Sequence, residues 1–339
     1  MSQTQMRQTQ MRQTQMIRVL RELSAAHFRS GEEVAMRLSL SRATVHNALS
    51  EARTLGLGIH SVTGRGYRLV EPVVWLDEEA LQSGLGLHGF SIQVADQVDS
   101  TNATLLQWAR ERPAAAHKQV VVAEWQRAGR GRRGRSWQAM PGGALLFSVL
   151  WRFDRPIAAL SGLSLVVGLA LVRALRGLGL AEAQMKWPND ILWRGRKLAG
   201  LLIELEGDML SPGSAVIGLG LNIRLPDEMK AQIDQPVADL AEALGEIDRN
   251  RILTAILMAL DVTLAEFELG GFPALQTEWQ AAHAFQGQAV RVQRGSPDTR
   301  GEVLHGIAQG VDNQGALLLD TPQGRLTLHS GEVTVRRDD

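Results

Sequence analysis

The residues best suited to chemistry are concentrated in one short loop. Five arginines and three glycines lie in the nine positions from Arg127 to Arg135. Apolar runs typical of strands, at 119–123 and 144–150, lead into and out of this loop. Guanidinium groups are permanently charged, fork-shaped donors for carboxylate and phosphate oxygens, and glycines let backbone N–H groups approach a ligand closely. The composition predicts a loop that closes over a small anion, while a solvated loop or a nonspecific nucleic-acid contact explains it equally well.

A second group of polar residues lies further along the chain, at 186–190 and at 197. Pro188 interrupts strand pairing, so Asn189 and Asp190 are expected on a turn between strands. Lys197 opens an apolar strand, where its ammonium group either reaches water or faces a reacting carboxylate. The arginine loop is not a Walker A phosphate loop, because no Gly-Lys-Ser/Thr follows its glycines.

Two hydroxyl residues stand between a predicted strand at 91–98 and a predicted helix at 103–110. Ser100 and Thr101 at this place are expected to cap the helix, which is the favoured interpretation; alternatively, they bind a polar ligand group together with the helix N-terminus. Gly218 and Gly220 share one face of a strand predicted at 215–223. Glycines at these positions permit a close approach to the backbone.

The beginning of the chain has the pattern of a DNA-binding module. A periodic helix is expected at 16–26, a Ser30/Glu33 capping box starts a short second helix, and Ser41 is placed to cap a longer third one. Followed by a glycine-hinged hairpin, this pattern predicts a winged helix-turn-helix, and DNA binding is favoured over a packing module that contacts protein or nothing. The candidate DNA contacts are Arg42, Thr44, His46 and Asn47 in the third helix and Arg65 in the wing.

Composition sets limits on the function. The 339 residues allow two or three domains, and the net charge of +0 means that nucleic-acid binding has to come from a local patch. The absence of cysteine excludes disulfide scaffolds, thiol catalysis and cysteine zinc sites, and the histidines show no metal-ligand spacing. The polar five-residue repeat at 1–15 is expected to be disordered and is not a secretory signal. We expect a cytoplasmic protein without a membrane span.

The remaining pattern divides the chain. Helices are expected at 157–176, 248–269 and 272–282, and short alternating strands at 288–337 predict a small β-barrel of SH3-like size. The predicted domains are a winged helix-turn-helix at 16–72, a ligand-binding domain at 73–284 and a small β domain at 285–339.

Five segments in this order resemble those of bifunctional bacterial biotin protein ligases, which are also biotin operon repressors. They are Ser100-Thr101-Asn102, Gly129 to Arg135, Lys186 to Asp190, Lys197-Leu198-Ala199-Gly200 and Gly218 to Asn222. The resemblance covers about 16–337. It implies an α+β protein with an N-terminal winged helix-turn-helix, a central mixed α/β ligase domain similar to class II synthetases, and a C-terminal SH3-like β-barrel. A lipoate ligase shares the central fold, but we would expect it to lack the arginine loop and the N-terminal module.

The resemblance implies that biotin and MgATP form biotinyl-5′-AMP, and that the biotin then passes to a lysine of the biotin carboxyl carrier protein of acetyl-CoA carboxylase. It places Ser100, Thr101, Asn102, Gln126, Arg130, Gly131, Arg132 and Lys197 at biotin, and Arg133, Arg135, Trp137, Lys186, Asn189 and Asn222 at ATP. It implies no metal site of the protein's own, since Mg²⁺ enters with ATP.

Three residues are the catalytic candidates that the resemblance implies. Arg132 would hold the junction of phosphate and carboxylate, and Lys197 would stabilise charge on the carboxylate. Asp190 would orient or deprotonate the incoming amine, although capping a turn explains it equally well. Two ATP candidates also have simpler alternatives: core packing for Trp137 and a salt bridge to Asp190 for Lys186.

The implied partners are the carrier protein, operator DNA and, with the adenylate bound as corepressor, a second copy of the chain. Two alternatives remain open at this point: a ligase that no longer represses, and a ligand-sensing repressor without ligase activity. The segment 224–245 contains no motif that bears on the choice.

Overall fold

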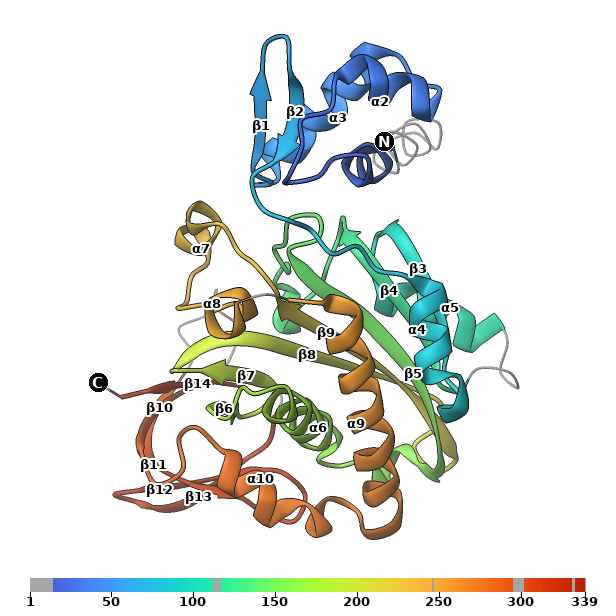
Figure 1. Ribbon diagram of the computed structural model, residues 1–339. Coiled ribbons are helices and arrows are strands. Elements are labelled where there is room, and N and C mark those ends of the chain that lie inside the picture. Colours follow the sequence, from blue (N-terminus) through green and yellow to red (C-terminus); the bar gives the residue numbers. More distant parts are fainter. Residues whose placement is uncertain (1–14, 112–116, 246, 295–301, 331–332, 339) are drawn as a thin grey trace.

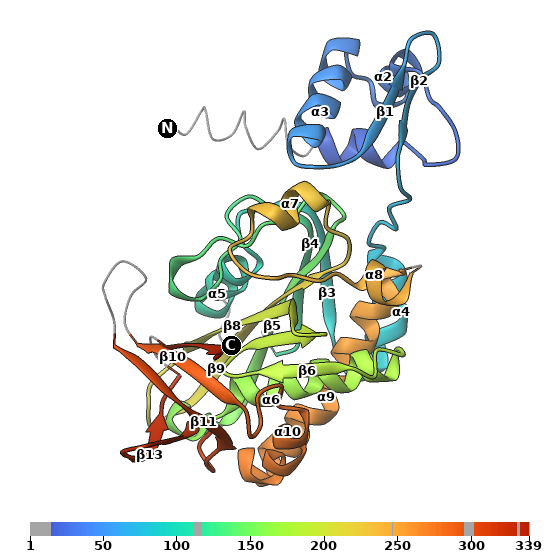
Figure 2. The same cartoon turned by 90° about the vertical axis from the view of Figure 1, so that its left-hand side faces the viewer.

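The computed structural model describes residues 15–111, 117–245, 247–294, 302–330 and 333–338 (Figure 1). Most of the repeat predicted at 1–15 therefore lies outside the described residues. A small N-terminal module lies at one end and is joined by an extended linker to a central sheet with helices on its faces. A second, smaller sheet closes the C-terminal end (Figures 1 and 2). No helix among the described residues is both long and apolar enough to cross a bilayer.

The N-terminal module is the predicted winged helix-turn-helix. A helix at 15–21 precedes α2 (Gly31–Leu38) and α3 (Arg42–Thr54), and the hairpin of β1 (Ile59–Val62) and β2 (Gly66–Leu69) forms the wing. Both predicted caps are confirmed, because Ser30 accepts a hydrogen bond from Glu33 N and Ser41 accepts one from Thr44 N.

The first helix is shorter than the predicted 16–26. It ends at position 21, and Ala26 is exposed. Ser24 Oγ accepts a hydrogen bond from His27 N at 3.1 Å, a local turn that competes with helical hydrogen bonding.

The central domain is built on a seven-stranded sheet in the order β3-β4-β5-β9-β8-β7-β6. β3 and β4 are parallel and every other neighbouring pair is antiparallel. The bounds are β3 Ser91–Val98, β4 Gln119–Gln126, β5 Ala144–Pro156, β6 Ala183–Lys186, β7 Asp190–Trp193, β8 Arg196–Glu206 and β9 Pro212–Asn222.

Helices cover both faces of this sheet. On one face α5 (Thr101–Glu111) packs Leu105 against Val121 and Val216. On the other face lie α4 (Glu78–Leu85), α6 (Leu163–Gly177) and α9 (Arg249–Gly270), which share the main apolar core with β4, β5 and β9. The shorter elements are η1 (Gly86–His88), η2 (Arg132–Gly134), η3 (Ile157–Ala159), α7 (Asp227–Gln232), α8 (Leu240–Leu244), η4 (Phe272–Ala274) and α10 (Gln276–Ala282).

The long helix predicted at 157–176 begins later than expected. A single 3-10 turn, η3, precedes it, and α6 starts at Leu163. Gly162 stands between them with a φ of 80°, which a residue with a side chain rarely adopts. The apolar composition of 157–162 therefore did not reveal the break.

Both edges of the central sheet are covered. On β3, the outward backbone N–H groups of Ile92 and Val94 donate to side chains of α4, Gln82 at 3.0 Å and Glu78 at 2.7 Å. On β6, Met185 O accepts from Ala284 N at 2.7 Å, where the chain enters the C-terminal domain.

The C-terminal domain is an antiparallel sheet in the order β13-β12-β11-β10-β14. Its strands are β10 Ala289–Arg294, β11 Val303–Val311, β12 Leu317–Thr321, β13 Gly324–Leu328 and β14 Val333–Arg337. It is the small β unit that the alternating pattern predicts. Its apolar residues, such as Val290, Leu317 and Val335, belong to the same core cluster as the central domain, so the two pack as one body.

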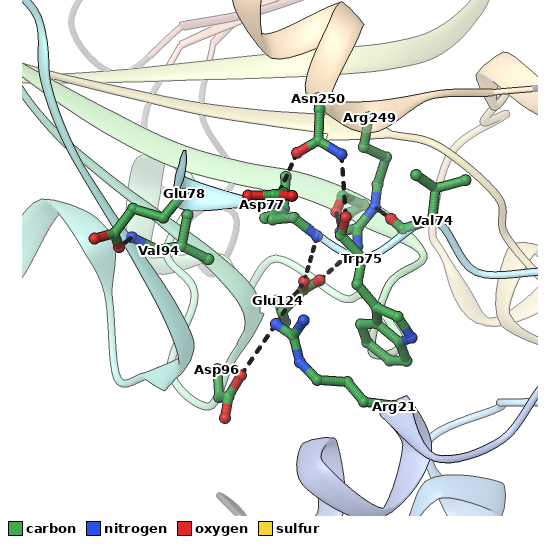
Figure 3. A network of polar contacts seen from close by, with 12 residues as sticks. Arg21, Val74, Trp75, Asp77, Glu78, Val94, Asp96, Glu124, Arg249 and Asn250 are labelled. Atoms are coloured by element: carbon green, nitrogen blue, oxygen red, sulfur yellow. Dashed lines mark hydrogen bonds and ion pairs between the residues drawn. The ribbon is translucent and has the colours of Figure 1, made fainter. Parts of the chain in front are cut away.

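A buried ion pair joins the linker to the central domain (Figure 3). Glu124 on β4 and Arg249 at the start of α9 lie 2.5 Å apart and are 0% and 1% exposed. Glu124 also accepts from Leu76 N, and Arg249 donates to the carbonyls of Val74 and Ala144. The linker and the start of α9, which are distant in sequence, thus both bond to Glu124 on β4.

One residue of the N-terminal module reaches the same point. Arg21 lies 3.3 Å from Glu124 and 3.2 Å from Asp96, and its guanidinium lies over the ring of Trp75 (Figure 3). The core of this module also includes Trp125 and Met140, which flank the arginine loop in sequence. The module therefore packs directly on the strand that leads to the loop.

Candidate functional site

The ligand candidates come together where β3 and β4 end. β3 and β4 are parallel, and Val98 pairs with Gln126. The two strands therefore finish side by side at the same end of the sheet. Ser100 and Thr101 start α5 there and are buried, and Thr101 N donates to Gln126 Oε1 at 2.7 Å. Ser100 Oγ accepts from Ala103 N at 3.4 Å. Ser100 therefore caps the helix, as the capping interpretation predicted, whereas the hydroxyl of Thr101 bonds to Ser148 and Gln126. Both residues also line a cavity.

Gly218 and Gly220 lie on β9 beneath two large side chains. A methyl group at Gly218 would overlap the amide of Asn102, and one at Gly220 would come within 2.7 Å of the Trp137 indole. The side chains of Asn102 and Trp137 therefore use the space that the two glycines leave open, and they form two walls of the site.

Two cavities adjoin one another at this place. The inner one, of about 60 Å³, lies among the β4 end, the α5 start and β9. The outer one, of about 440 Å³, lies between the arginine loop, the turn at 187–189 and β14. Asn189 lies on this turn as predicted, but Asp190, predicted there too, is the first residue of β7 and pairs with Gly200. The two share a wall formed by Gly131, Arg132, Trp137, Asn189 and Lys197.

The predicted residues divide between these cavities. The inner cavity is lined by all eight biotin candidates, namely Ser100, Thr101, Asn102, Gln126, Arg130, Gly131, Arg132 and Lys197. The outer cavity is lined by all six ATP candidates, Arg133, Arg135, Trp137, Lys186, Asn189 and Asn222, and also by the third catalytic candidate, Asp190.

Lys197 is held firmly at the shared wall. Its ammonium lies 2.8 Å from Asp190 and 5.5 Å from the centre of the Trp137 ring. Its backbone is clamped by the segment after α7, because Lys197 N donates to Pro236 O and Lys197 O accepts from Ala238 N, each at 2.9 Å. The side chain is 18% exposed and therefore does not extend into water.

Positive charge exceeds negative charge around Asp190. Its carboxylate also lies 3.7 Å from Lys186, which confirms the salt bridge suggested for that lysine. Burial lowers the pKa of Lys186, and the nearby cations Lys197 and Arg336 lower it further, against the opposing effect of Asp190. Such a cluster gains stability when an anion arrives.

The arginine loop rests on the catalytic and C-terminal domains. Arg130 pairs with Glu204 at 3.2 Å. Arg132 donates to Asn189 Oδ1 at 3.3 Å and to the carbonyl of Ser330, and burial lowers its pKa. Arg133 donates to Thr334 Oγ1 at 2.6 Å. The loop thus joins the two cavities to the last strand of the chain.

The two asparagines of the outer cavity have structural partners. Asn189 Nδ2 donates to Leu201 O at 2.7 Å, and Asn222 Nδ2 donates to Ala238 O at 3.0 Å. Asn222 is buried and fixes the segment that clamps Lys197. Both residues therefore support the cavity wall, in addition to any contact with a ligand.

The candidate DNA face is on α3. Arg42, His46 and Asn47 are exposed there, and Thr44 is partly buried with its hydroxyl 2.8 Å from Ser41 Oγ. Arg65 is exposed at the hairpin turn and lies over the ring of Phe28 at 4.7 Å. Four of the five predicted contacts are thus free of burial, and Thr44 contributes to a helix cap.

Three family models match the chain. The Biotin/lipoate A/B protein ligase family matches residues 94–222, the Biotin protein ligase C terminal domain matches 285–336, and an HTH domain matches 12–68. The Bifunctional ligase/repressor BirA of Escherichia coli is 34% identical over 94% of this chain and 97% of its own length. The chain belongs to the bifunctional biotin ligase/repressor family.

Two further relatives support membership of the biotin ligase family. The Biotin--[acetyl-CoA-carboxylase] ligase of Mycobacterium tuberculosis is 35% identical over 76% of this chain and 95% of its own length. The solved biotin protein ligase of Aquifex aeolicus, in complex with biotin and ATP, has a TM-score of 0.60 and 27% identity, and covers 73% of this chain and 99% of that one. The fold predicted from sequence is confirmed, and the chain is an enzyme of the ligase class.

Sequence reasoning missed four parts of this ligase site. Gln232 to Val237 and Arg336 line the outer cavity, and Ser148 and Glu204 bond to residues of the inner one. Ser148 was detectable as the hydroxyl within an otherwise apolar strand. The segment 232–237 has no motif, because it contributes largely through its backbone.

Proposed function

We propose that the chain joins biotin to ATP and then transfers the biotin to a lysine of a biotin carboxyl carrier protein. One observation carries the proposal: a cavity lined by hydroxyl and amide groups and a cation-rich cavity share a wall that contains Lys197 and Arg132. A carboxylate and a triphosphate are both anionic, so bringing them into contact requires cations between them.

In the first step, a biotin carboxylate oxygen attacks the α-phosphorus of ATP. The new bond gives biotinyl-5′-AMP, and pyrophosphate leaves with the electron pair of the broken bond. Lys197 holds the carboxylate, and Arg132, which borders both cavities, lies at the junction with the phosphate. Arg133, Arg135 and Lys186 face the phosphates, while Trp137 and Asn222 form the wall near the nucleotide base.

Asp190 is assigned an orienting role. Its carboxylate lies between Lys197 and Lys186, so it holds the ammonium of Lys197 at the shared wall. These contacts favour orientation over deprotonation of the incoming amine, because both carboxylate oxygens already face ammonium groups.

In the second step, the ε-amine of the carrier lysine attacks the acyl carbon of the adenylate. An amide forms, AMP leaves, and the amine loses a proton. Arg130 and Arg132 keep the loop over the inner cavity through Glu204 and Asn189, and such cover keeps water from the activated acyl group. We assign Mg²⁺ to the phosphates of the incoming ATP, because this cation prefers phosphate oxygens and water as ligands.

The inner cavity has to enlarge when biotin enters. Small-molecule sites usually occupy about 300 Å³ or more, and the inner cavity has about 60 Å³. The Trp137 ring and the side chain of Arg130, which pairs with Glu204, border this space and are the groups best placed to move. Opening and reclosing of the loop is therefore part of the proposed cycle.

For repression, we propose that the adenylate acts as corepressor and favours a homodimer whose two winged modules bind an operator. The support is the contact of the N-terminal module with β4, just before the loop. In this scheme Arg42, His46, Asn47 and Arg65 contact DNA, and Thr44 positions α3. The domain limits 16–72, 73–284 and 285–339 are retained as proposals.

A streptavidin blot tests the ligase. Carrier domain incubated with the full chain, biotin and MgATP is expected to give a labelled band that disappears when ATP is omitted. A missing band with folded protein would contradict the ligase and favour the sensing repressor. A gel shift on the upstream region of the organism's biotin genes should respond to biotin plus ATP; an unchanged shift would leave a ligase without repression.

A further inference from the structure

An unbroken chain of hydrogen bonds lies behind the inner cavity. It runs from Glu204 on β8 to Asn102 on α5, then to Ser148 on β5, and ends at Thr101. Asn102 and Thr101 line the cavity, whereas Glu204 and Ser148 support them from outside its described wall. The proposed reaction uses Glu204 only through its ion pair with Arg130, and it gives no role to the links through Asn102 and Ser148.

The direction of the chain is set at its Glu204 end. Asn102 Nδ2 lies 2.7 Å from Glu204 Oε2 and 3.2 Å from the carbonyl oxygen of Leu202. Carboxylate and carbonyl oxygens accept hydrogen bonds, so the atom that faces both is the amide nitrogen. Asn102 Oδ1 therefore points the other way, to Ser148, and accepts a hydrogen bond from it.

Ser148 passes this polarity to Thr101. Its Oγ lies 2.5 Å from Asn102 Oδ1 and 2.6 Å from Thr101 Oγ1. A hydroxyl has a single proton, and that of Ser148 is donated to Asn102. A second acceptor, Gln126 Oε1, lies 3.2 Å from Thr101 Oγ1. The 2.6 Å contact with Ser148 Oγ needs a proton between the two oxygens, so Thr101 donates to Ser148, and its Oγ1 presents lone pairs to the cavity.

The neighbouring side chain supplies the opposite polarity. Gln126 Oε1 accepts from Thr101 N, which leaves Nε2 as the donor end of this amide. Thr101 and Gln126 both line the inner cavity. An acceptor beside a donor complements a ligand that carries an N–H group next to a carbonyl, as a cyclic urea does.

We propose that Glu204 and Ser148 are positioning residues that make Thr101 Oγ1 an obligatory acceptor, so that the cavity selects a ligand with an N–H group at that place. This rests on the proposed function, in which the ligand is the ureido ring of biotin. In a ring with an oxygen in place of that N–H, the lone pairs of the ring oxygen would face those of Thr101 Oγ1. Neither oxygen would then have a hydrogen-bond donor.

The experiment compares biotin with two carbamate analogues, each with a different ureido N–H replaced by a ring oxygen. The measurement is kcat/KM for pyrophosphate release with ATP. With the unaltered protein, the analogue that lacks the N–H facing Thr101 is expected to be roughly 100-fold worse than biotin, which corresponds to an unsatisfied buried group.

Two variants remove the polarity at different points. Ser148→Ala frees the proton of Thr101, for which Gln126 Oε1 at 3.2 Å and the ring oxygen of the analogue then compete. Because Gln126 Oε1 already accepts from Thr101 N, the ring oxygen gains the donor, and we expect the preference for biotin to fall about tenfold. Glu204→Gln replaces an acceptor by an amide that both accepts and donates, so Leu202 O alone orients Asn102, and a smaller fall is expected. Because Glu204 is partly exposed, this variant tests the chain without emptying a core position.

Glu206→Gln is the matched control. Glu206 lies two residues further along β8 and pairs with Arg110 at 3.0 Å, outside the inner cavity. The preference of the Glu206→Gln variant for biotin over the analogue should equal that of the unaltered protein.

The outcomes separate the two proposals. If the unaltered protein releases no pyrophosphate with biotin, the proposed function fails. If it does, and an active Ser148→Ala keeps the full preference, the relay to Thr101 is overturned. A full preference in Glu204→Gln would overturn Glu204 as the origin of the polarity.

Discussion

Two clusters of charged side chains lie on different strands of the central sheet, one around Glu124 on β4 and one around Asp190 on β7, and they are built differently. Around Glu124, two arginines share one buried carboxylate, and the backbone carbonyls of Val74 and Ala144 each accept a hydrogen bond from Arg249 (Figure 3). Around Asp190, two lysines face one carboxylate beside a cavity of about 440 Å³.

The difference distinguishes a structural cluster from a reactive one. In the first, Glu124 and Arg249 are fully buried and bond to protein groups, so the charges stabilise one arrangement of the chain. In the second, Arg132, Arg133 and Arg336 add positive charge at the same cavity wall. Such an excess is costly in the empty protein and is relieved by anionic substrates, which is the behaviour expected of a functional site.

The largest effect is expected from a variant that disrupts the structural cluster around Glu124. Arg249→Met leaves Glu124 buried without its main partner, and the free energy of unfolding should fall by about 3–5 kcal/mol. Urea unfolding followed by circular dichroism measures it. The double variant Glu124→Gln, Arg249→Met should recover most of this loss, because neither charge remains buried. A single variant as stable as the unaltered protein would contradict the structural role.

The reactive cluster should respond in the opposite way. Lys197→Ala removes the cation from the biotin carboxylate, and adenylate formation should slow by about 10²–10³-fold, with little change in unfolding. Pyrophosphate release measures the rate. Lys230→Ala is the matched control, since Lys230 also lies 2.8 Å from an aspartate, Asp239, but outside both cavities. Equal rates in the two variants would contradict the assignment.

His283 extends the comparison to a titratable side chain that is buried without a charged partner. His283 is 5% exposed and stacks on Trp279, and burial lowers its pKa to about 4 from an ordinary value near 6.5. The folded state keeps it neutral while the unfolded state binds a proton, so stability is lost as pH falls from 6.5 toward 4. One pKa unit corresponds to about 1.4 kcal/mol, so the loss should approach 3 kcal/mol.

Unfolding of the unaltered protein and of His283→Gln between pH 7.5 and pH 4 measures this contribution. The pH dependence of stability should be shallower in the variant over that interval. Parallel curves would show that another group causes the acid sensitivity.

The smallest effect belongs to the exposed arm of the structural cluster. Arg21 is 33% exposed, so Arg21→Met should lower the free energy of unfolding by about 1 kcal/mol or less. The Glu124–Arg249 pair remains, and the ring of Trp75 can still pack against methionine. A loss as large as that of Arg249→Met would place Arg21 within the core of the cluster.

The sequence allowed the order of domains and most elements to be predicted, because caps and periodicity are local. Ser30 and Ser41 cap as expected. The start of α6 was missed, since Gly162 breaks an apolar segment whose composition continues unchanged.

The site was predictable where side chains carry the chemistry, as at Lys197 and Arg132. It was not predictable where the fold supplies neighbours. Glu204 meets Asn102 across 102 positions of sequence, and the clamp on Lys197 is made by the backbone carbonyl of Pro236. Such contacts depend on strand register and leave no local pattern.

The covered edges of the central sheet bear on how copies of this protein can aggregate. An uncovered ladder of N–H and C=O groups acts as a template for strands of other molecules. Here Gln82 and Glu78 accept from the outward N–H groups of Ile92 and Val94 on β3, and Ala284 N donates to Met185 O on β6. Amyloid-like stacking through either strand would first have to displace these native groups, so concentrated solutions of the folded chain should resist fibre formation.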